Sequence, residues 1–392
     1  MLNKAGNTPA AAENRDLLKI ALIRSRYNPF GGAERFVSCA IDALRARGAE
    51  VTLVTRRWTG VEEAAAIVCD PFYLGSLWRD WGFARCVCAK LKQASFDLVQ
   101  SHERLSCCDV YRAGDGVHRE WLRQRRRVLG VFGKLGIALN PYHHYVRAAE
   151  KRLFNSPRLK AVICNSRMVK DEIRADFDVP ESKLHVIYSG VDTRVFHPAL
   201  KAEHSDKIRI ERQIPLGATV FLLLGSGFER KGLAVLLQAM TQLPPDAHLL
   251  VVGKDKRTEF FQNRATSLGI GGRVHFVGGK HEVAPFYGAA DVFVLPTLYD
   301  PFPNAALEAM AAGLPIITSF KSGAVDLIEN GKNGFVCDAL DDAQLAQFMR
   351  ELMDGAQRQA MGAAARATVE PLTPEAMSAA LVALYRGLLE AQ

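Results

Sequence analysis

The side chains best suited to chemistry lie in one stretch, where the carboxylates Asp300 and Glu308 are separated by seven residues. A carboxylate accepts hydrogen bonds from paired hydroxyl groups, so one of the two could hold a sugar and the other a ribose. The stretch begins with the unbroken apolar run 292–295, which is typical of a parallel strand buried on both faces. A proline-rich loop follows and carries Asp300. The competing interpretation is an ordinary strand, loop and helix with solvated carboxylates.

A helix is predicted directly after this loop. Asn304 can serve as its N-cap, and Gly313 with Pro315 marks its end. The first N–H groups of a helix lack partners within the helix and carry partial positive charge, so Pro303, Asn304 and Ala305 are candidates to face a bound anion. The loop delivers this helix N-terminus to the carboxyl edge of a sheet, which is where open α/β sheets bind nucleotides.

A second cluster follows the apolar run 220–224 and reads Gly225-Ser226-Gly227-Phe228-Glu229-Arg230-Lys231-Gly232. The two cations precede another predicted helix and are suited to clamp a pyrophosphate, with Arg230 as a fork and Lys231 as a point charge. The pattern is not a dinucleotide-binding fingerprint, because Arg230 occupies the position of its last glycine.

The first half of the chain offers weaker signals. Gly31 and Gly32 follow the predicted strand 17–24, and such a pair either lets backbone N–H groups approach an anion or is simply a turn. His102 and His118 each follow a short predicted strand, and Asp115 lies just before His118. All three would line the cleft at the carboxyl end of the sheet, although a lone histidine is more often a structural residue.

The chain has 392 residues, long enough for two domains, and its 48% hydrophobic and 23% charged residues are typical of a soluble globular protein. Strands alternate with helical stretches, which predicts an α/β fold with doubly wound parallel sheets. We place domains at 17–189 and 190–370, with a boundary near Gly190 and a disordered N-terminus over 1–16. The strands are predicted at 17–24, 51–55, 98–101, 161–165, 220–224, 248–253, 274–277, 292–295, 313–318 and 334–337.

No apolar run reaches the roughly eighteen residues of a membrane span, and residues 1–15 lack the core of a signal peptide, so we expect a cytoplasmic protein. The eight cysteines show neither Cys-x2-Cys spacing nor a nearby histidine pattern. We therefore expect reduced thiols rather than zinc ligands or disulfides. They are Cys39, Cys69, Cys86, Cys88, Cys107, Cys108, Cys164 and Cys337.

The positive charge is concentrated in one segment. Residues 119–160 hold eleven Lys and Arg against two Glu, a net charge of +9, whereas the whole chain carries +8. Arginines mixed with Trp, Leu, Val and Phe suit an interfacial helix on an anionic membrane. The alternatives are a solvated charged face or nucleic-acid binding, and no nucleic-acid motif supports the latter. The candidate membrane residues are Arg123, Arg125, Arg126, Arg127 and Lys134.

Taken together, these motifs resemble those of the retaining glycosyltransferases of family four, which have the GT-B fold of two Rossmann-like domains facing a cleft. The segment from Asp300 to Glu308 is similar to the Glu-x7-Glu segment of that family, with Asp300 in place of the first Glu. The resemblance implies that Lys231 binds the donor diphosphate and that His118 contacts the donor sugar. It places Gly31 and Gly32 against the donor phosphates and the acceptor.

The same resemblance implies that Val277 and Gly278 recognise the base of the donor. It also implies that a last helix, over 371–392, crosses back onto the first domain. Ser226 replaces an Arg that many members carry, and Arg230 can supply that charge. The segment Asp176-Phe177-Asp178 matches a manganese signature of the other large glycosyltransferase fold, but no predicted strand leads into it, so a turn is expected.

The glycine-rich loop and the basic insert resemble the lipopolysaccharide core glucosyltransferase subgroup. This implies retaining transfer of a hexose, glucose from UDP-glucose, to a lipid-linked oligosaccharide, with no cofactor or metal, by a peripheral protein on the inner face of the cytoplasmic membrane. The alternatives are transfer of N-acetylglucosamine, mannose or a heptose to another acceptor, a sugar-nucleotide epimerase, and a non-catalytic membrane-surface adaptor.

Overall fold

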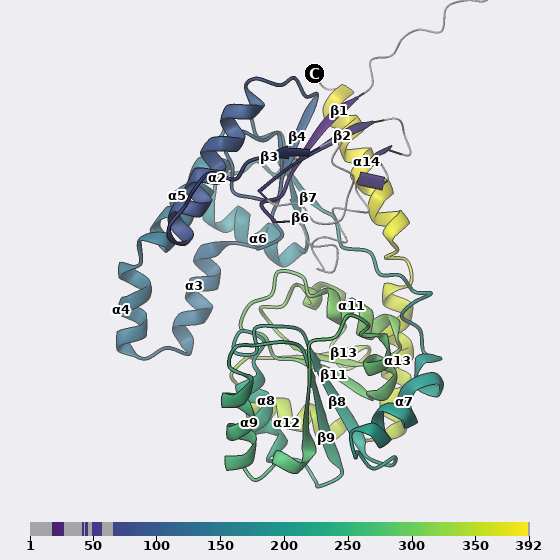
Figure 1. Ribbon diagram of the computed structural model, residues 1–392. Helices are drawn as coiled ribbons and strands as arrows, with labels where there is room; N and C mark the ends of the chain where they lie inside the picture. Colours follow the sequence, from purple (N-terminus) through teal and green to yellow (C-terminus); the bar gives the residue numbers. More distant parts are fainter. Residues whose placement is uncertain (1–17, 27–40, 43, 46–48, 57–65, 391–392) are drawn as a thin grey trace, which may run out of the picture.

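The computed structural model describes the chain except for residues 1–17, 27–40, 43, 46–48, 57–65 and 391–392 (Figure 1). The N-terminus expected to be disordered, the glycine pair Gly31 and Gly32, and Cys39 therefore lie outside the described residues. The remainder forms two α/β domains, one above the other in Figure 1, each built around its own sheet.

The first sheet has seven parallel strands in the order β3-β2-β1-β4-β5-β6-β7. The sequence did not predict β3 and β7, which have only three residues each and therefore too short an apolar pattern to recognise. The strands are β1 (Lys19–Ile23), β2 (Glu50–Thr55), β3 (Ala66–Val68), β4 (Leu98–Ser101), β5 (Val110–Arg112), β6 (Ala161–Cys164) and β7 (Leu184–Val186).

The second sheet has six parallel strands in the order β10-β9-β8-β11-β12-β13. All six were predicted from apolar runs, because a strand buried on both faces carries apolar residues without alternation. They are β8 (Thr219–Leu224), β9 (Ala247–Val252), β10 (Val274–Gly278), β11 (Val292–Leu295), β12 (Ile316–Ser319) and β13 (Gly334–Cys337).

Helices cover both sheets (Figure 1). Those in the first half are α2 (Gly75–Leu91), α3 (His118–Arg127), α4 (Val131–Leu139), α5 (Pro141–Phe154) and α6 (Arg167–Asp176). Those in the second half are α7 (Leu200–Glu211), α8 (Leu233–Met240), α9 (Thr258–Ser267), α10 (Ala284–Ala289), α11 (Asn304–Ala311), α12 (Asp342–Glu351), α13 (Gly355–Val369) and α14 (Pro374–Glu390). Short 3-10 helices span Glu181–Lys183, Gly271–Arg273 and Gly323–Leu327.

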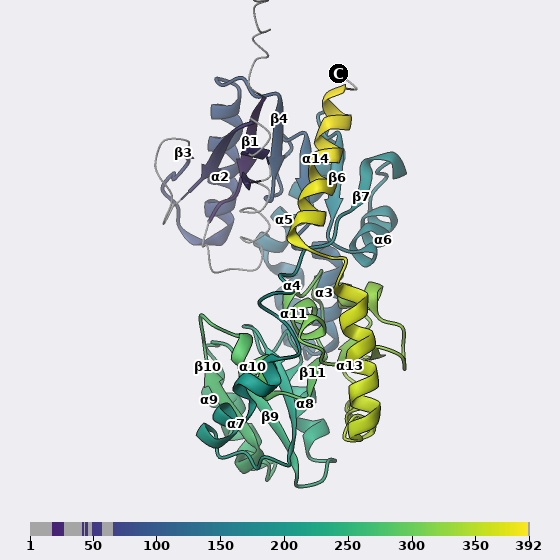
Figure 2. The same cartoon turned by 90° about the vertical axis from the view of Figure 1, so that its right-hand side faces the viewer.

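The last helix, α14, lies against the first sheet rather than the second (Figure 2). Leu381 and Tyr385 belong to the same buried cluster as Ile20 and Leu22 of β1. The chain therefore crosses between the domains twice, and the two crossings touch where Val191 N donates to Leu372 O at 2.8 Å. A Cβ at residue 190 would lie 2.4 Å from the backbone N of Pro374, so this contact requires a glycine.

The prediction of reduced cysteines is wrong for one pair. Cys88 in α2 and Cys107 in the loop after β4 form a disulfide, with their Cα atoms 5.8 Å apart. The sequence separation of 19 residues gave no signal, because the pairing depends on how α2 packs beside β4. Within the described part of the chain, Cys69, Cys86, Cys108, Cys164 and Cys337 are free thiols.

One further detail differs from the sequence analysis. Asn304 is the first residue of α11, and Pro303 takes the N-cap position with no side-chain capping bond. Among the described helices, none is long and apolar enough to pass through a lipid bilayer.

Candidate active site in the cleft between the domains

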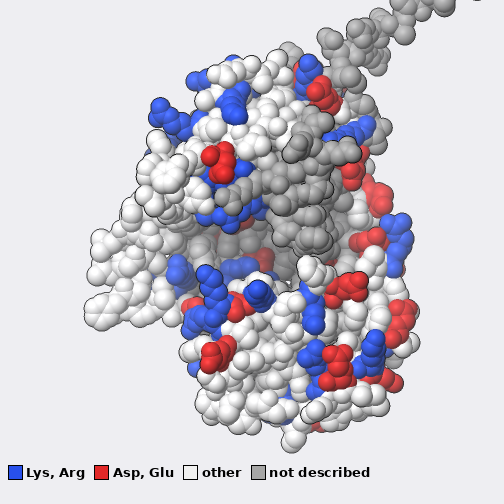
Figure 3. Space-filling model, in the orientation of Figure 1, with Lys and Arg blue, Asp and Glu red and all other residues white. Residues whose placement is uncertain are grey.

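The carboxyl ends of the two sheets point toward the space between the domains. Lys and Arg side chains gather where the two halves meet on the face shown in Figure 3. The loop after β5 brings Asp115 and His118 to this region from the first domain. The loops after β8 and β11 bring Lys231 and Asp300 from the second. Because parallel strands end at a common edge, residues distant in sequence share one site.

Arg230, Lys231 and Asp300 form a tight charge cluster. Asp300 Oδ2 lies 3.0 Å from Arg230 Nη1 and 3.3 Å from Lys231 Nζ. Burial alone would raise the pKa of the Asp300 carboxyl, but Lys231 and Arg230 together bring that pKa below its ordinary value. Burial in turn lowers the pKa of Lys231, with Asp300 opposing the shift. Asp300 is therefore ionised and offsets the charge of the two cations.

The glycine-rich loop is shaped around Lys231. Gly225 and Gly227 have φ values of +129° and +80°, which side-chain-bearing residues rarely adopt. A Cβ at residue 225 would lie 2.5 Å from Lys231 Cε, so the lysine side chain runs back across the glycine. A Cβ at residue 253, after β9, would likewise lie 2.3 Å from Gly225 O. The backbone N–H of Gly253 donates to Gly278 O at 3.0 Å. The loops after β8, β9 and β10 thus touch.

Glu308 lies in the second turn of α11 with 3% of its surface exposed. Its Oε2 accepts a hydrogen bond from Tyr287 Oη at 2.7 Å, and the same hydroxyl lies 3.2 Å from Ala305 O. Tyr287 was not predicted as a site residue, because its contact with Glu308 joins α10 to α11 and no sequence pattern around Tyr287 indicates it. Val277 and Gly278 lie at the end of β10, beside the glycine-rich loop.

On the opposite side of the cleft, His118 is the first residue of α3. Its backbone N–H donates to Glu150 Oε1 at 2.9 Å, and its ring Nε2 lies 3.1 Å from His143 Nδ1. Burial, helped by Arg104 and His143, lowers the pKa of His118 to about 3, so the ring is neutral near pH 7. Glu150 and His143 both come from α5 and were not found from the sequence, since they become partners of His118 only through helix packing.

The other two cleft candidates differ in burial. His102 is buried with 5% exposure, and its ring Nε2 lies 3.2 Å from Gln100 Nε2. Burial, with Arg112 and Arg24, lowers the pKa of His102 well below its ordinary value, as expected for a structural histidine. Asp115 is exposed and lies 3.6 Å from Arg104.

The two halves of the site meet directly. Val117, which precedes His118, donates its N–H to the hydroxyl of Tyr299 at 2.9 Å, and Tyr299 precedes Asp300. The loop that carries Asp300, beside Arg230 and Lys231, is thus in contact with the segment that leads into His118.

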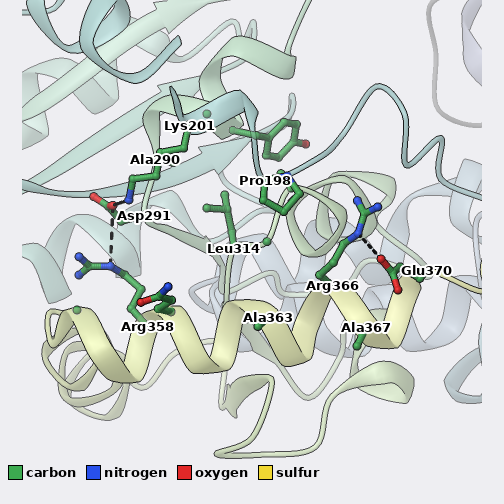
Figure 4. A pocket seen from close by; sticks show the side chains of 16 residues that line it. Pro198, Lys201, Ala290, Asp291, Leu314, Arg358, Ala363, Arg366, Ala367 and Glu370 are labelled. Atoms are coloured by element: carbon green, nitrogen blue, oxygen red, sulfur yellow. Dashed lines mark hydrogen bonds and ion pairs between the residues drawn. The ribbon is translucent and has the colours of Figure 1, made fainter. Parts of the chain in front are cut away.

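A cavity of about 610 Å³ lies away from the cleft, between α7, α10 and α13 (Figure 4). Its charged groups are engaged with each other: Lys201 lies 2.8 Å from Asp291, and Arg366 lies 3.0 Å from Glu370. Tyr287 lines it, yet the hydroxyl of that residue is bonded to Glu308. Lys201 and Arg358 both approach Asp291 in this cavity, but Asp291 and Leu314 place it at the amino ends of β11 and β12. Open α/β sheets bind ligands at the carboxyl ends of their strands, so the cleft is the candidate active site.

A second histidine pair, His248 and His275, lies across β9 and β10 with Nδ1 and Nε2 3.0 Å apart. Burial, followed by the effect of His248, lowers the pKa of His275 to about 4. Below pH 6.5 the unfolded chain binds protons at His118 and His275 that the folded chain does not, so stability falls as the pH falls. Both shifts therefore make the folded state less stable at pH 5 than at pH 7.

We therefore expect the urea midpoint to be markedly lower at pH 5 than at pH 7. Far-UV circular dichroism is the suitable probe, because the four tryptophans belong to the first half of the chain and His275 lies in the second domain. The variant His275→Gln serves as the control, because it cannot take up a proton and should show a smaller drop. Equal midpoints at the two pH values would contradict the assignment of neutral buried rings.

Two family models match the sequence. The model for Glycosyltransferase Family 4 matches residues 30–195, and the model for Glycosyl transferases group 1 matches residues 204–368. The lipopolysaccharide glucosyltransferase WaaG of Escherichia coli K12 is 26% identical over 342 residues, which cover 85% of this chain and 89% of that protein. An uncharacterized glycosyltransferase of Methanocaldococcus jannaschii is 32% identical over 179 residues. That match covers 44% of this chain and 45% of the relative, less than half of either.

Solved structures share the fold. The crystal structure of WaaG, a glycosyltransferase involved in lipopolysaccharide biosynthesis, matches with a TM-score of 0.77 and 24% identity over 92% of this chain and 98% of that one. Anabaena HepE in complex with UDP-glucose matches with a TM-score of 0.72 and 19% identity over 94% and 100% of the two chains. These likenesses confirm the predicted arrangement of two Rossmann-like domains facing a cleft.

Proposed function

Because the chain belongs to the family-four glycosyltransferases with the GT-B fold, we propose that it transfers a hexose, glucose from UDP-glucose, to a lipid-linked oligosaccharide of the lipopolysaccharide inner core. The observation that carries the proposal is the cluster of Arg230, Lys231 and Asp300 opposite His118. Similarity to the lipopolysaccharide glucosyltransferase WaaG supports the acceptor class, and the fold shared with a UDP-glucose complex supports the donor.

The charges of the cleft suit the charge that develops when a glycosidic bond to a diphosphate breaks. The diphosphate gains negative charge, which Arg230, Lys231 and the N-terminus of α11 stabilise. These groups are fixed before the reaction, so they need no reorganisation at the moment of bond breaking. We propose that they replace a metal ion and that the transfer retains the anomeric configuration.

In this proposal, the two carboxylates bind the uncharged sugar and ribose of the donor. Glu308 accepts hydrogen bonds from ribose hydroxyls, and Asp300 accepts them from the sugar, with the neutral ring of His118 on the other side of the sugar. Without donor, Asp300 offsets the charge of Arg230 and Lys231. A bound diphosphate supplies negative charge to the same cations and so frees the oxygens of Asp300 for the sugar hydroxyls.

We further propose that the helical hairpin of α3 and α4 attaches the protein to the inner face of the cytoplasmic membrane. The hairpin extends away from the rest of the first domain (Figure 1). Phe132 is 90% exposed and Val131 78% exposed, while Lys134 and Arg126 lie on the surface beside them. Exposed apolar side chains next to cations suit an anionic lipid interface.

The other basic residues of the hairpin are less available. Arg123 pairs with Glu120 at 2.9 Å, and Arg127 pairs with Asp338 of the second domain at 2.7 Å. Arg125 is partly buried. Of the five predicted membrane residues, Arg126 and Lys134 are the two exposed cations that pair with no carboxylate among the described residues.

Binding to vesicles that contain phosphatidylglycerol should weaken when the salt concentration rises from 0.1 to 1 M, because the Debye length falls from about 10 Å to about 3 Å. Phe132→Ser should weaken it further by removing apolar contact, whereas the exposed-lysine control Lys332→Ala in the second domain should bind like the wild type. Sedimentation with vesicles measures both effects. Binding that ignores salt and the Phe132 substitution would place the membrane contact elsewhere.

The donor is tested by thermal shift against a panel of nucleotide sugars and free nucleotides, with and without chelator. A ligand at a hundred times its dissociation constant adds about 2.7 kcal/mol of stability. We expect UDP-glucose to stabilise the protein most, and chelator to have no effect. Preference for another nucleotide sugar would change the assigned donor, and no response to any would favour the adaptor without enzymatic activity. Interconversion of free UDP-sugars would indicate an epimerase.

A further inference from the structure

The loop that carries Asp300 is anchored in the first domain by the residue before it. Tyr299 is 2% exposed, although its ring extends from the second domain into the first. Its hydroxyl accepts a hydrogen bond from Val117 N at 2.9 Å and donates to Glu172 Oε2 in α6 at 2.7 Å. Val117 precedes His118, so this one hydroxyl lies between the two sides of the cleft.

The first domain has a space shaped for this hydroxyl. A Cβ at residue 116 would lie 2.0 Å from Tyr299 Oη and 2.9 Å from Pro301 Cγ. Gly116 also has a φ of +66°, in the left-handed region that favours glycine. Both observations show that a residue with a side chain at position 116 would push the Asp300 loop away from the first domain.

A second anchor lies on the other side of the same loop. Lys321 Nζ is 2.9 Å from Glu172 Oε1 and 3.1 Å from Glu120 Oε1 in α3. The backbone O of Lys321 accepts a hydrogen bond from Asp300 N at 2.9 Å. Glu172 thus receives one bond from Tyr299 and one from Lys321, and the two residues that flank Asp300 in space are both tied to α6.

We infer that Tyr299 and Lys321 are positioning residues that hold the Asp300 side of the cleft against the His118 side, so that the donor sugar is contacted from both domains at once. The inference rests on the proposed function for its catalytic consequence, but the closed arrangement of the domains can be measured without any substrate. The side chains of both residues extend into the first domain, whereas only their backbone carbonyls contact the clamp: Tyr299 O accepts from Arg230 Nη1 at 2.9 Å, and Lys321 O accepts from Asp300 N at 2.9 Å. A side-chain substitution at either position therefore leaves these clamp contacts in place.

This division gives a specific expectation. Nucleotide diphosphate binding needs only the second domain and stays within about twofold of wild type when Tyr299 is changed. Sugar transfer needs both domains, so kcat falls by about ten- to a hundredfold when the two hydrogen bonds, one of them to a carboxylate, are lost. A merely structural role would lower stability without separating kcat from nucleotide affinity.

The test compares Tyr299→Phe with Tyr142→Phe, which removes a tyrosine bond to Asp80 inside the first domain alone, 2.9 Å in length. Lys321→Met is compared with Lys321→Arg, which keeps the charge and should restore most of the kcat. X-ray scattering reports the separation of the domains in the absence of substrate, and calorimetry reports UDP affinity. Thermal melting and circular dichroism check that each variant folds. If Tyr299→Phe does not fold, Glu172→Gln weakens the same anchor from the side of the first domain.

We expect Tyr299→Phe and Lys321→Met to increase the radius of gyration and lower kcat while UDP affinity stays constant. The inference would be overturned if Tyr299→Phe and Lys321→Met had the same radius of gyration and the same kcat as Tyr142→Phe. If the wild type transfers no sugar, the proposed function fails, and the scattering comparison still decides whether the anchors hold the domains together.

Discussion

Lys231→Met should lower kcat by about 10²- to 10³-fold, the usual effect of removing one fixed group that stabilises developing negative charge. Methionine keeps most of the volume of the side chain that crosses Gly225, so the loop should stay packed while the charge is lost. The fold should survive, because Arg230 still pairs with Asp300 at 3.0 Å. Steady-state kinetics with the donor identified by thermal shift measures the loss.

The same variant should also change the pH dependence. Against the effect of burial, Lys231 is one of the two cations that lower the pKa of Asp300, so its removal raises that pKa and moves the loss of activity in acid to higher pH. Lys332→Ala, an exposed lysine that pairs only with nearby Glu329, serves as the control and should keep full activity. Full activity in Lys231→Met would remove Lys231 from the proposed diphosphate clamp.

Glu308→Gln should weaken nucleotide binding by about ten- to a hundredfold, because hydrogen bonds to a charged group contribute about 1.5–3 kcal/mol. Glutamine has the same shape and keeps an acceptor for the hydroxyl of Tyr287, so the variant isolates the loss of negative charge. Calorimetry with UDP measures the change in affinity.

The ribose assignment is tested with 2′-deoxy-UDP. If Glu308 holds the ribose hydroxyls, the wild type should prefer UDP to the deoxy nucleotide and Glu308→Ala should lose much of that preference, as in a double-mutant cycle. Tyr287→Phe is the matched comparison, since it keeps the carboxylate of Glu308 and removes the hydroxyl that bonds it at 2.7 Å and Ala305 O at 3.2 Å. Its effect on the preference should be smaller. An unchanged preference in Glu308→Ala would place the ribose elsewhere.

The amino-acid sequence by itself determined the two-domain α/β organisation and the candidate residues on the second-domain side of the cleft. Strands β4, β11 and β13 were predicted with their observed bounds, and the apolar run Val-Phe-Val-Leu of β11 is typical of a parallel strand buried on both faces. Arg230, Lys231 and Asp300 were found for a similar reason. Each follows a recognisable strand, and parallel strands of one sheet end at a common edge.

The tertiary structure alone decided which groups hold these residues in place. His143, Glu150, Tyr287 and Tyr299 were all missed, and so was the disulfide between Cys88 and Cys107. Their partners lie 19 to 182 residues away along the chain. Local periodicity carries no information on such pairs, because a buried donor takes the acceptor that helix packing or domain contact places beside it. The sequence thus identified the candidate residues, and the packing of α5, α6 and α10 decided which side chains lie beside them.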